Sequence, residues 1–176
     1  MLQEKALRAK VHAGPEKERQ VVQRMTLHQL STTEFSTVAP NSILVAVDCS
    51  RTSLRAADYA AGLARRNGVT VVGVYVRHHN ALLLGAPSLA VYAQSAETEL
   101  ATEAEQYLTE SAGRLGTACA FTVLDGTPVT AIRELARELQ VSALVVGQSE
   151  HWAHKRFGSL AVRLARTAPC PVIIVP

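Results

Sequence analysis

The sequence predicts an α/β fold: a doubly wound, five-stranded parallel sheet flanked by helices, in a single domain that follows an N-terminal helical extension. From residue 41 onward, short apolar runs alternate with stretches of helical periodicity. The runs are apolar at consecutive positions, as expected of parallel strands that are covered on both faces. Glycine and proline separate them from the helical stretches. We therefore divide the chain into an extension, residues 1–40, and one domain, residues 41–176.

The extension has its own helical pattern. Apolar residues recur at helical spacing from Leu2 to Ala13, and Gly14-Pro15 ends that pattern. A second helix is predicted from Glu16 to about Leu30, followed by a Ser/Thr-rich linker. The extension would serve as a packing arm, a partner-binding or dimer-bracing helix, or a basic nucleic-acid arm. Its charges are mixed, which disfavours the last of these.

The domain opens with a predicted βαβ unit. Residues 42–48 form an apolar run that ends in Asp48, and residues 69–76 form a second run rich in β-branched side chains. Between them, Leu54 and several alanines repeat at helical spacing, and Asn67-Gly68 supplies a left-handed helix end. A strand, a helix and a strand within this length make one βαβ unit.

The rest of the domain repeats the alternation. Residues 77–93 are predicted to be irregular, and an alanine- and glutamate-rich helix is expected from about residue 94 to residue 115. Thr127 is the expected N-cap of a further helix, with Pro128 at its first position. The remaining predicted elements are strands at residues 118–124, 141–146 and 171–175 and a helix from Ser159 to about Arg166.

Composition excludes several classes of protein. The 176 residues are 48% hydrophobic and 19% charged, as in a globular protein. No apolar run approaches the roughly 18–20 residues that a membrane span needs. The net charge of +3 gives no case for nucleic acid. The three cysteines form no CxxC pair, which suits free thiols in a reducing compartment. We predict a cytoplasmic protein that binds neither membrane nor nucleic acid.

Two strand ends and one helix start carry the candidate chemistry. Asp48 and Gly147 each end a predicted strand, and Gly158-Ser159 opens a predicted helix. Ligands of doubly wound sheets bind where such strand ends meet, so Asp48 and Gly147 converge if their strands are neighbours. Glycine lets phosphate approach main-chain N–H groups, and Ser159 adds a hydroxyl at a helix N-terminus. Alternatively, Asp48 caps the next helix or closes a turn through Ser50, and the glycines serve backbone geometry.

No catalytic or metal-binding constellation accompanies these residues. A Ser/His/Asp set, paired carboxylates and a full P-loop are all absent from the sequence, so no enzymatic turnover is predicted. His78, His79, His151 and His154 follow predicted strands without metal-ligand spacing, so no metal site is predicted.

These motifs resemble the universal stress protein family over about residues 41–176. The resemblance implies an adenine nucleotide at the carboxyl edge of the sheet, with Asp48 facing ribose and phosphates. Ala46, Val47 and Val76 would line the adenine pocket, and Val146 and Leu160 would flank the glycine loop. It also implies a homodimer through the C-terminal strand. The matching segments are Ile43 to Asp48 with Ser50, Gly126-Thr127-Pro128, Val145-Val146-Gly147, and Gly158-Ser159 to Val175.

One part of the family pattern is altered. Nucleotide-binding members resemble Gly-x2-Gly-x9-Gly-Ser/Thr, but the second glycine falls on Glu150 here, and the loop to Gly158 is two residues shorter. A carboxylate repels phosphate, and any side chain limits close backbone approach. The side chains of His151, His154, Lys155 and Arg156 would either compensate by facing a triphosphate or form a solvated basic loop. ATP or a related adenine nucleotide, another anion such as AMP or a dinucleotide, and no ligand all stay open.

The sequence thus predicts a non-enzymatic regulatory protein of stress response that binds ATP, with Mg²⁺ as a companion ion, and acts through conformation or exchange of a protein partner. The alternative is a nucleotide-free dimeric adaptor. An adenylating enzyme is disfavoured because Asp48-Cys49-Ser50-Arg51 replaces the Ser-Gly-Gly-type loop which that class needs. The last strand is apolar on both faces and would leave an open edge, which pairing with a second copy removes.

Overall fold

The structure is a computed structural model that describes residues 41–77, 87–148 and 160–176. It confirms the predicted class: one five-stranded sheet in the order β3-β2-β1-β4-β5, with every neighbouring pair parallel. In chain order, the elements are β1 (Ile43–Ala46), α4 (Arg51–Asn67), β2 (Val71–Arg77), α5 (Pro87–Leu115), β3 (Cys119–Asp125), α6 (Pro128–Glu138), β4 (Ala143–Gly147), α7 (Leu160–Thr167) and β5 (Val172–Val175).

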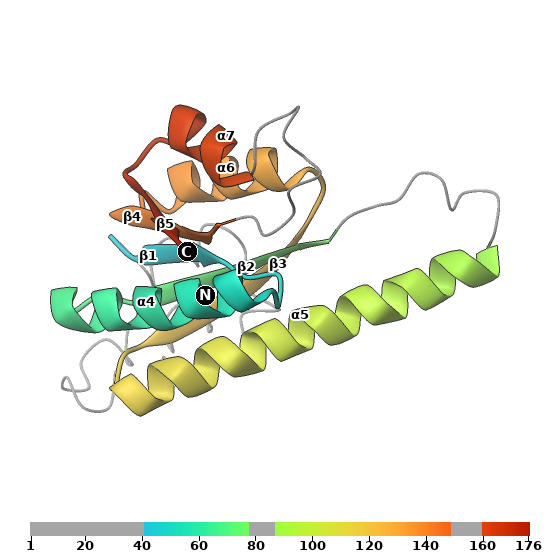
Figure 1. The fold of residues 1–176 in the computed structure, drawn as a ribbon, viewed down its shortest axis with the longest axis horizontal. Coiled ribbons are helices and arrows are strands. Elements are labelled where there is room, and N and C mark those ends of the chain that lie inside the picture. Colours follow the sequence, from blue (N-terminus) through green and yellow to red (C-terminus); the bar gives the residue numbers. More distant parts are fainter. Residues whose placement is uncertain (1–40, 78–86, 149–159) are drawn as a thin grey trace, which may run out of the picture.

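The helices form one layer on each side of the sheet. Figure 1 shows α4 and α5 below the sheet and α6 and α7 above it. Each layer has its own apolar core, and the strands contribute alternate residues to the two cores. Ile43 and Val45 of β1 pack with α4 and α5, whereas Leu44 packs with α6 and α7. The consecutive apolar positions of the strands therefore do reflect burial on both faces.

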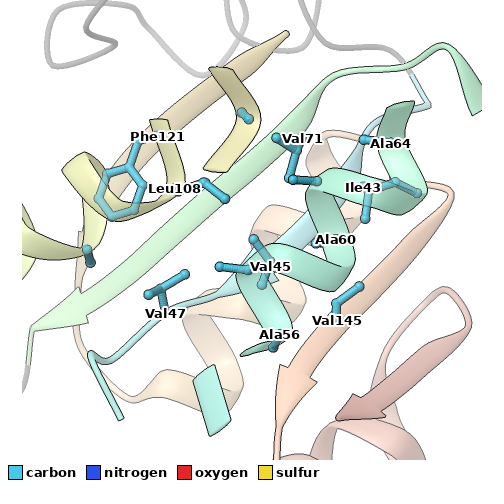
Figure 2. Packing of buried hydrophobic residues seen from close by; sticks show 14 of the residues in the cluster. Ile43, Val45, Val47, Ala56, Ala60, Ala64, Val71, Leu108, Phe121 and Val145 are labelled. Atoms are coloured by element: carbon cyan, nitrogen blue, oxygen red, sulfur yellow. The ribbon is translucent and has the colours of Figure 1, made fainter. Parts of the chain in front are cut away.

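Helix α4 packs very close to the sheet because its inner face consists of alanine. These alanines are fully buried against β1, β2 and β4 (Figure 2). The helix ends at Gly68, whose φ of 67° is the left-handed conformation predicted there. The buried alanines are Ala56, Ala57, Ala60, Ala61 and Ala64.

The predicted start of the helix that follows β2 was wrong. Helix α5 begins at Pro87, seven residues upstream of the expected start near residue 94. The sequence analysis places Pro87 in an irregular segment, because proline often marks a loop. Proline has no N–H, but N–H groups in the first turn of a helix have no partner within the helix, so Pro87 can begin α5. In Figure 1 the N-terminal half of α5 extends well beyond the sheet. The helices predicted for residues 1–40 lie outside the described residues.

Polar contacts fix α5 on the domain. The Asp58 carboxylate of α4 accepts hydrogen bonds from the Tyr107 hydroxyl at 2.8 Å and from the Ser111 hydroxyl at 2.5 Å. Further toward the N-terminus of α5, Glu97 accepts a 2.7 Å bond from the hydroxyl of Tyr75 on β2. The helix is thus bound to both α4 and the sheet.

Strands β3 and β5 form the two edges of the sheet, as the order requires. The β3 edge ends in an ion pair between Arg77 and Asp125, with Nε 2.8 Å from Oδ1. On β5, Ile174 is 43% exposed, so the predicted apolar edge is present. Among the described residues, none of the helices combines the length and apolar character that crossing a bilayer requires.

Gly73 occupies the middle of β2 because the core leaves no room for a side chain. A Cβ atom at this position would lie 2.4 Å from Cδ2 of Phe121 and 2.5 Å from Cδ2 of Leu108. Phe121 lies on β3 and Leu108 on α5, and Figure 2 shows both in the core under α5. The absent side chain therefore lets α5 and β3 pack against the centre of the sheet.

We expect Gly73→Ala to lower the free energy of unfolding by about 1–3 kcal/mol, because overpacking displaces Phe121 or Leu108. Urea denaturation would measure the change. The control is Gly113→Ala on α5, where nothing lies within 4 Å of the new Cβ. That change should stabilise the protein by about 0.5–1 kcal/mol, as alanine favours helix. Equal effects of the two substitutions would contradict this account.

Candidate functional site

A cleft opens at the carboxyl ends of β1 and β4. These strands pair in parallel, with Val45 opposite Val145, so Asp48 and Gly147 follow neighbouring strands as predicted. Strand β2 lies on the other side of β1, and the chain order reverses at this point. The cleft encloses a cavity of about 460 Å³. Ligands of doubly wound folds bind at this topological switch point.

The β1–α4 turn forms one wall of the cleft and holds Asp48 in place. The Asp48 Oδ1 atom accepts a 3.0 Å bond from the Ser50 N–H, and its own N–H donates to Ser53 Oγ at 3.2 Å. Ser50 is the N-cap of α4 and accepts a 3.3 Å bond from the Ser53 N–H. Asp48 thus closes the turn through Ser50, the structural role foreseen as an alternative, and also lines the cleft.

The Asp48 carboxylate is ionised at neutral pH. Burial raises its pKa, but hydrogen bonds from Ser50 and Ser53 outweigh that effect and bring the pKa below its usual value. The carboxylate therefore presents a fixed negative charge and hydrogen-bond acceptors to the cleft. Such a group suits the hydroxyls of a sugar and repels a phosphate placed directly against it.

Cys49 points away from the cleft, toward α5. Its φ of 62° is left-handed, which a non-glycine residue adopts only where the surroundings impose it. The Cys49 Sγ donates a hydrogen bond to the Leu100 carbonyl oxygen at 3.3 Å. Burial, with the nearby carboxylates of Glu103 and Asp48, raises the pKa of the thiol to about 11. Cys49 is therefore a protonated anchor and not a nucleophile.

Gly147 is required by close packing between β4 and α4. A Cβ atom there would lie 2.7 Å from the Ser53 nitrogen and 2.9 Å from the Thr52 carbonyl oxygen. Both are backbone atoms of the first turn of α4, so neither moves without shifting the helix. The next N–H, of Gln148, donates to the Val175 carbonyl oxygen at 2.7 Å. That N–H is therefore already used within the sheet.

The other wall comes from α6 and α7, on the opposite face of the sheet. Thr127 is the N-cap of α6, as predicted, but its side chain makes no capping hydrogen bond. Pro128 and Ile132 add apolar surface, and Leu160 and Arg163 face the cleft from α7. This wall thus combines apolar contacts with one hydroxyl and one guanidinium.

Most of the predicted site residues lie in the cleft, although their roles toward a ligand stay predictions. Gly158 and Ser159 lie outside the described residues, as do Glu150 and the basic residues of the same loop. The predicted residues that line the cleft are Ala46, Val47, Asp48, Val76, Val146, Gly147 and Leu160.

Arg163 and the start of α6 were not predicted as lining residues of the cleft. Arg163 follows Leu160 by three positions, so helical periodicity places both on one face, and this signal was available. The position of α6 beside the cleft depends on tertiary packing, which no local sequence pattern indicates. The lining residues that were missed are Ser50, Thr52, Ser53, Val74, Thr127, Pro128, Val129, Ile132, Gln148 and Arg163.

The arrangement suits binding more than turnover. Apolar side chains from β1, β2 and β4 form the floor, and a few polar groups stand on the two walls, as in pockets for small molecules with a flat apolar portion. Within the part of the chain that the structure describes, no three His, Cys, Asp or Glu side chains group as metal ligands. A divalent ion held by Asp48 would need further ligands from a bound phosphate.

Comparison with known proteins agrees with this geometry. The model of the universal stress protein family matches residues 40–176. A universal stress protein of Methanocaldococcus jannaschii is 28% identical over 137 residues, which are 76% of this chain and 80% of that protein.

Two solved structures with similar folds hold adenine nucleotides. A universal stress protein in complex with cAMP is 25% identical, with a TM-score of 0.64, over 78% of this chain and 98% of that one. The universal stress protein of Archaeoglobus fulgidus in complex with dAMP is also 25% identical, with a TM-score of 0.59, over 77% and 97% of the two chains.

We expect Gly147→Ala to lower the free energy of unfolding by about 1–3 kcal/mol, because the new methyl group meets the backbone of α4. Thermal or urea denaturation would measure it. The control, Gly62→Ala, lies within α4, and its Cβ would meet only Arg66 Nη1 at 3.6 Å. The control should leave stability unchanged or raise it. A neutral Gly147→Ala variant would show that the close contact is not required.

Proposed function

The chain belongs to the universal stress protein family, and from this premise we propose that it is a regulatory protein of stress response which binds an adenine nucleotide. The nucleotide occupies the cleft between β1 and β4. The observation that carries the proposal is the position of Asp48, ionised and held by Ser50, beside an apolar floor at the switch point. The cAMP and dAMP complexes of two similar proteins support it.

The proposed pose follows from the two kinds of lining. The adenine ring packs on Ala46, Val47 and Val76, which supply apolar surface. The Asp48 carboxylate accepts hydrogen bonds from ribose hydroxyls. The phosphates extend past Val146, Gly147 and Leu160 toward Gly158-Ser159, which the family resemblance assigns to phosphate binding.

ATP is the proposed ligand, with Mg²⁺ as its companion ion. Asp48 is the carboxylate that would hold the ion together with phosphate oxygens, because Mg²⁺ accepts one or two carboxylates alongside substrate phosphates. Slow hydrolysis would be incidental, and the protein acts by conformation or partner exchange in the cytoplasm.

The turn that binds the ribose also provides a route for a conformational response. Asp48 contacts the N-cap of α4 through Ser50, and its neighbour Cys49 contacts the Leu100 carbonyl of α5. A ligand that shifts Asp48 therefore acts on both helices of this layer. A protein partner that binds α5 would then bind the occupied and the empty forms of the protein with different affinity.

A nucleotide-free dimeric adaptor is the second candidate. It is favoured by the Gln148 N–H, which donates to Val175 and so cannot bind phosphate. Glu150 in place of a glycine points the same way. In this case the cleft would have no nucleotide, and the protein would act through surface contacts alone.

We expect the protein to bind ATP or AMP. Asp48→Asn should weaken this binding about tenfold, because one charge-assisted hydrogen bond is lost. Asparagine keeps an acceptor for the Ser50 N–H, so the turn is preserved. Gly158→Trp should abolish binding if the family role of Gly158 holds. Calorimetric titration with and without Mg²⁺ measures both, with Glu110→Gln, exposed on α5, as the control. No heat with wild type supports the adaptor, and unchanged binding in both variants rejects the proposed pose.

In both candidates the protein forms a homodimer through the exposed edge of β5. The carbonyls of Pro171 and Val175 accept bonds from β4, so alternation along the strand directs the N–H groups of Val172 and Ile174 to the open edge. An edge strand with free main-chain donors and apolar side chains is a template for pairing with a second copy.

We expect wild type to be a dimer at micromolar concentration by light scattering, and Ile174→Pro to be monomeric. Proline removes the N–H that faces the open edge and leaves the bonds to β4 intact. Ile174→Val keeps that N–H and should stay dimeric. A monomeric wild type would reject the proposal, and a dimeric proline variant would place the interface elsewhere.

A further inference from the structure

We infer that Arg163 selects a negatively charged ligand for this cleft by binding the phosphate of the nucleotide, an assignment that rests on the function proposed above. Neither the sequence motifs nor the family pattern marks this residue. The assignment deepens the proposed function, because a cation at this position would let the cleft distinguish a nucleotide from the uncharged nucleoside.

The packing of α7 directs Arg163 to the cleft. Ala161 and Leu164 are buried in the core between α7, α6 and the sheet. Arg163 lies outside that core, on the face that it shares with Leu160, and both residues line the cleft. Long side chains of a helix lean toward its N-terminus, so the guanidinium reaches back toward the start of α7.

Electrostatics gives Arg163 a distinct role. Among the described lining residues, Arg163 and Asp48 are the charged ones. Asp48 lies in the turn that begins α4, whereas Arg163 lies on α7, which packs on the other face of the sheet (Figure 1). Without a bridging Mg²⁺, Asp48 repels a phosphate placed directly against it, so the phosphate of AMP is placed beside Arg163.

Two further observations support an anion at this wall. Within the described residues no carboxylate forms an ion pair with Arg163, so its charge is not neutralised by the protein there. Thr127, on the same wall, starts α6 without a side-chain capping bond, so its hydroxyl is available to a ligand. The positive end of the α6 dipole adds to the attraction. Guanidinium binds phosphate through two parallel hydrogen bonds.

The test compares AMP with adenosine, which differ only in the phosphate. We expect Arg163→Gln to weaken the binding of AMP about tenfold, because hydrogen bonds between charged groups are lost. The affinity for adenosine should change less than about twofold. Arg163→Lys should fall between wild type and Arg163→Gln, since lysine keeps the charge without the planar fork. Arg166→Gln removes the same charge from an exposed position on α7 that does not line the cleft, and should match wild type. Calorimetry at low and at physiological salt would provide the dissociation constants.

The outcomes separate the two claims. If wild type binds neither AMP, ATP nor adenosine, the proposed nucleotide function fails. If wild type binds AMP but Arg163→Gln binds it equally well, or loses AMP and adenosine to the same extent, the assignment of Arg163 fails while the function stands. Melting temperatures of the three variants within about 2 °C of wild type would show that the fold is intact.

Discussion

The site depends on the contact between the first turn of α4 and the end of β4. Gly147 has no side chain, so the backbone of Thr52 and Ser53 lies directly against it. This contact brings the β1–α4 turn over the switch point of the sheet, where Asp48 lines the cleft. A larger residue would push α4 away and move Asp48 with it. The glycine is therefore explained first by packing of the protein against itself, and a role toward phosphate would come in addition.

The second constraint is the separation of the domain into two layers with independent cores. Helix α4, through its alanine face, and α5 pack on one side, and α6 and α7 pack on the other. Each layer contributes one wall to the cleft where the strands end. Asp48, in the turn before α4, and Arg163, on α7, therefore line the same cleft from elements that belong to different layers (Figure 1). A ligand with a sugar at one end and an anionic group at the other matches that arrangement.

Much of the fold followed from the sequence, because apolar runs and helix ends are local signals. The alternation of strands and helices along the domain, the helix end at Gly68 and the helix start at Thr127-Pro128 were all predicted and are present. The start of α5 was missed because proline signals both loops and first turns. The site was predicted in part, since Asp48 and Gly147 stand at strand ends. Apart from Leu160, the wall of α6 and α7 was not predicted, because it arises when distant helices pack side by side.

The β1–α4 turn connects the cleft with the rest of the domain. Asp48 lines the cleft, Cys49 contacts α5 and Ser50 caps α4, so three consecutive residues contact three different parts of the structure. Cys49 stands in the middle of this turn with a left-handed φ of 62°. Tyr75 and Glu97 bind α5 to the sheet close to the same contact. A ligand that pulls on Asp48 therefore works against a strained residue that is anchored on α5. The proposed regulation through conformation would use this connection between the cleft and α5.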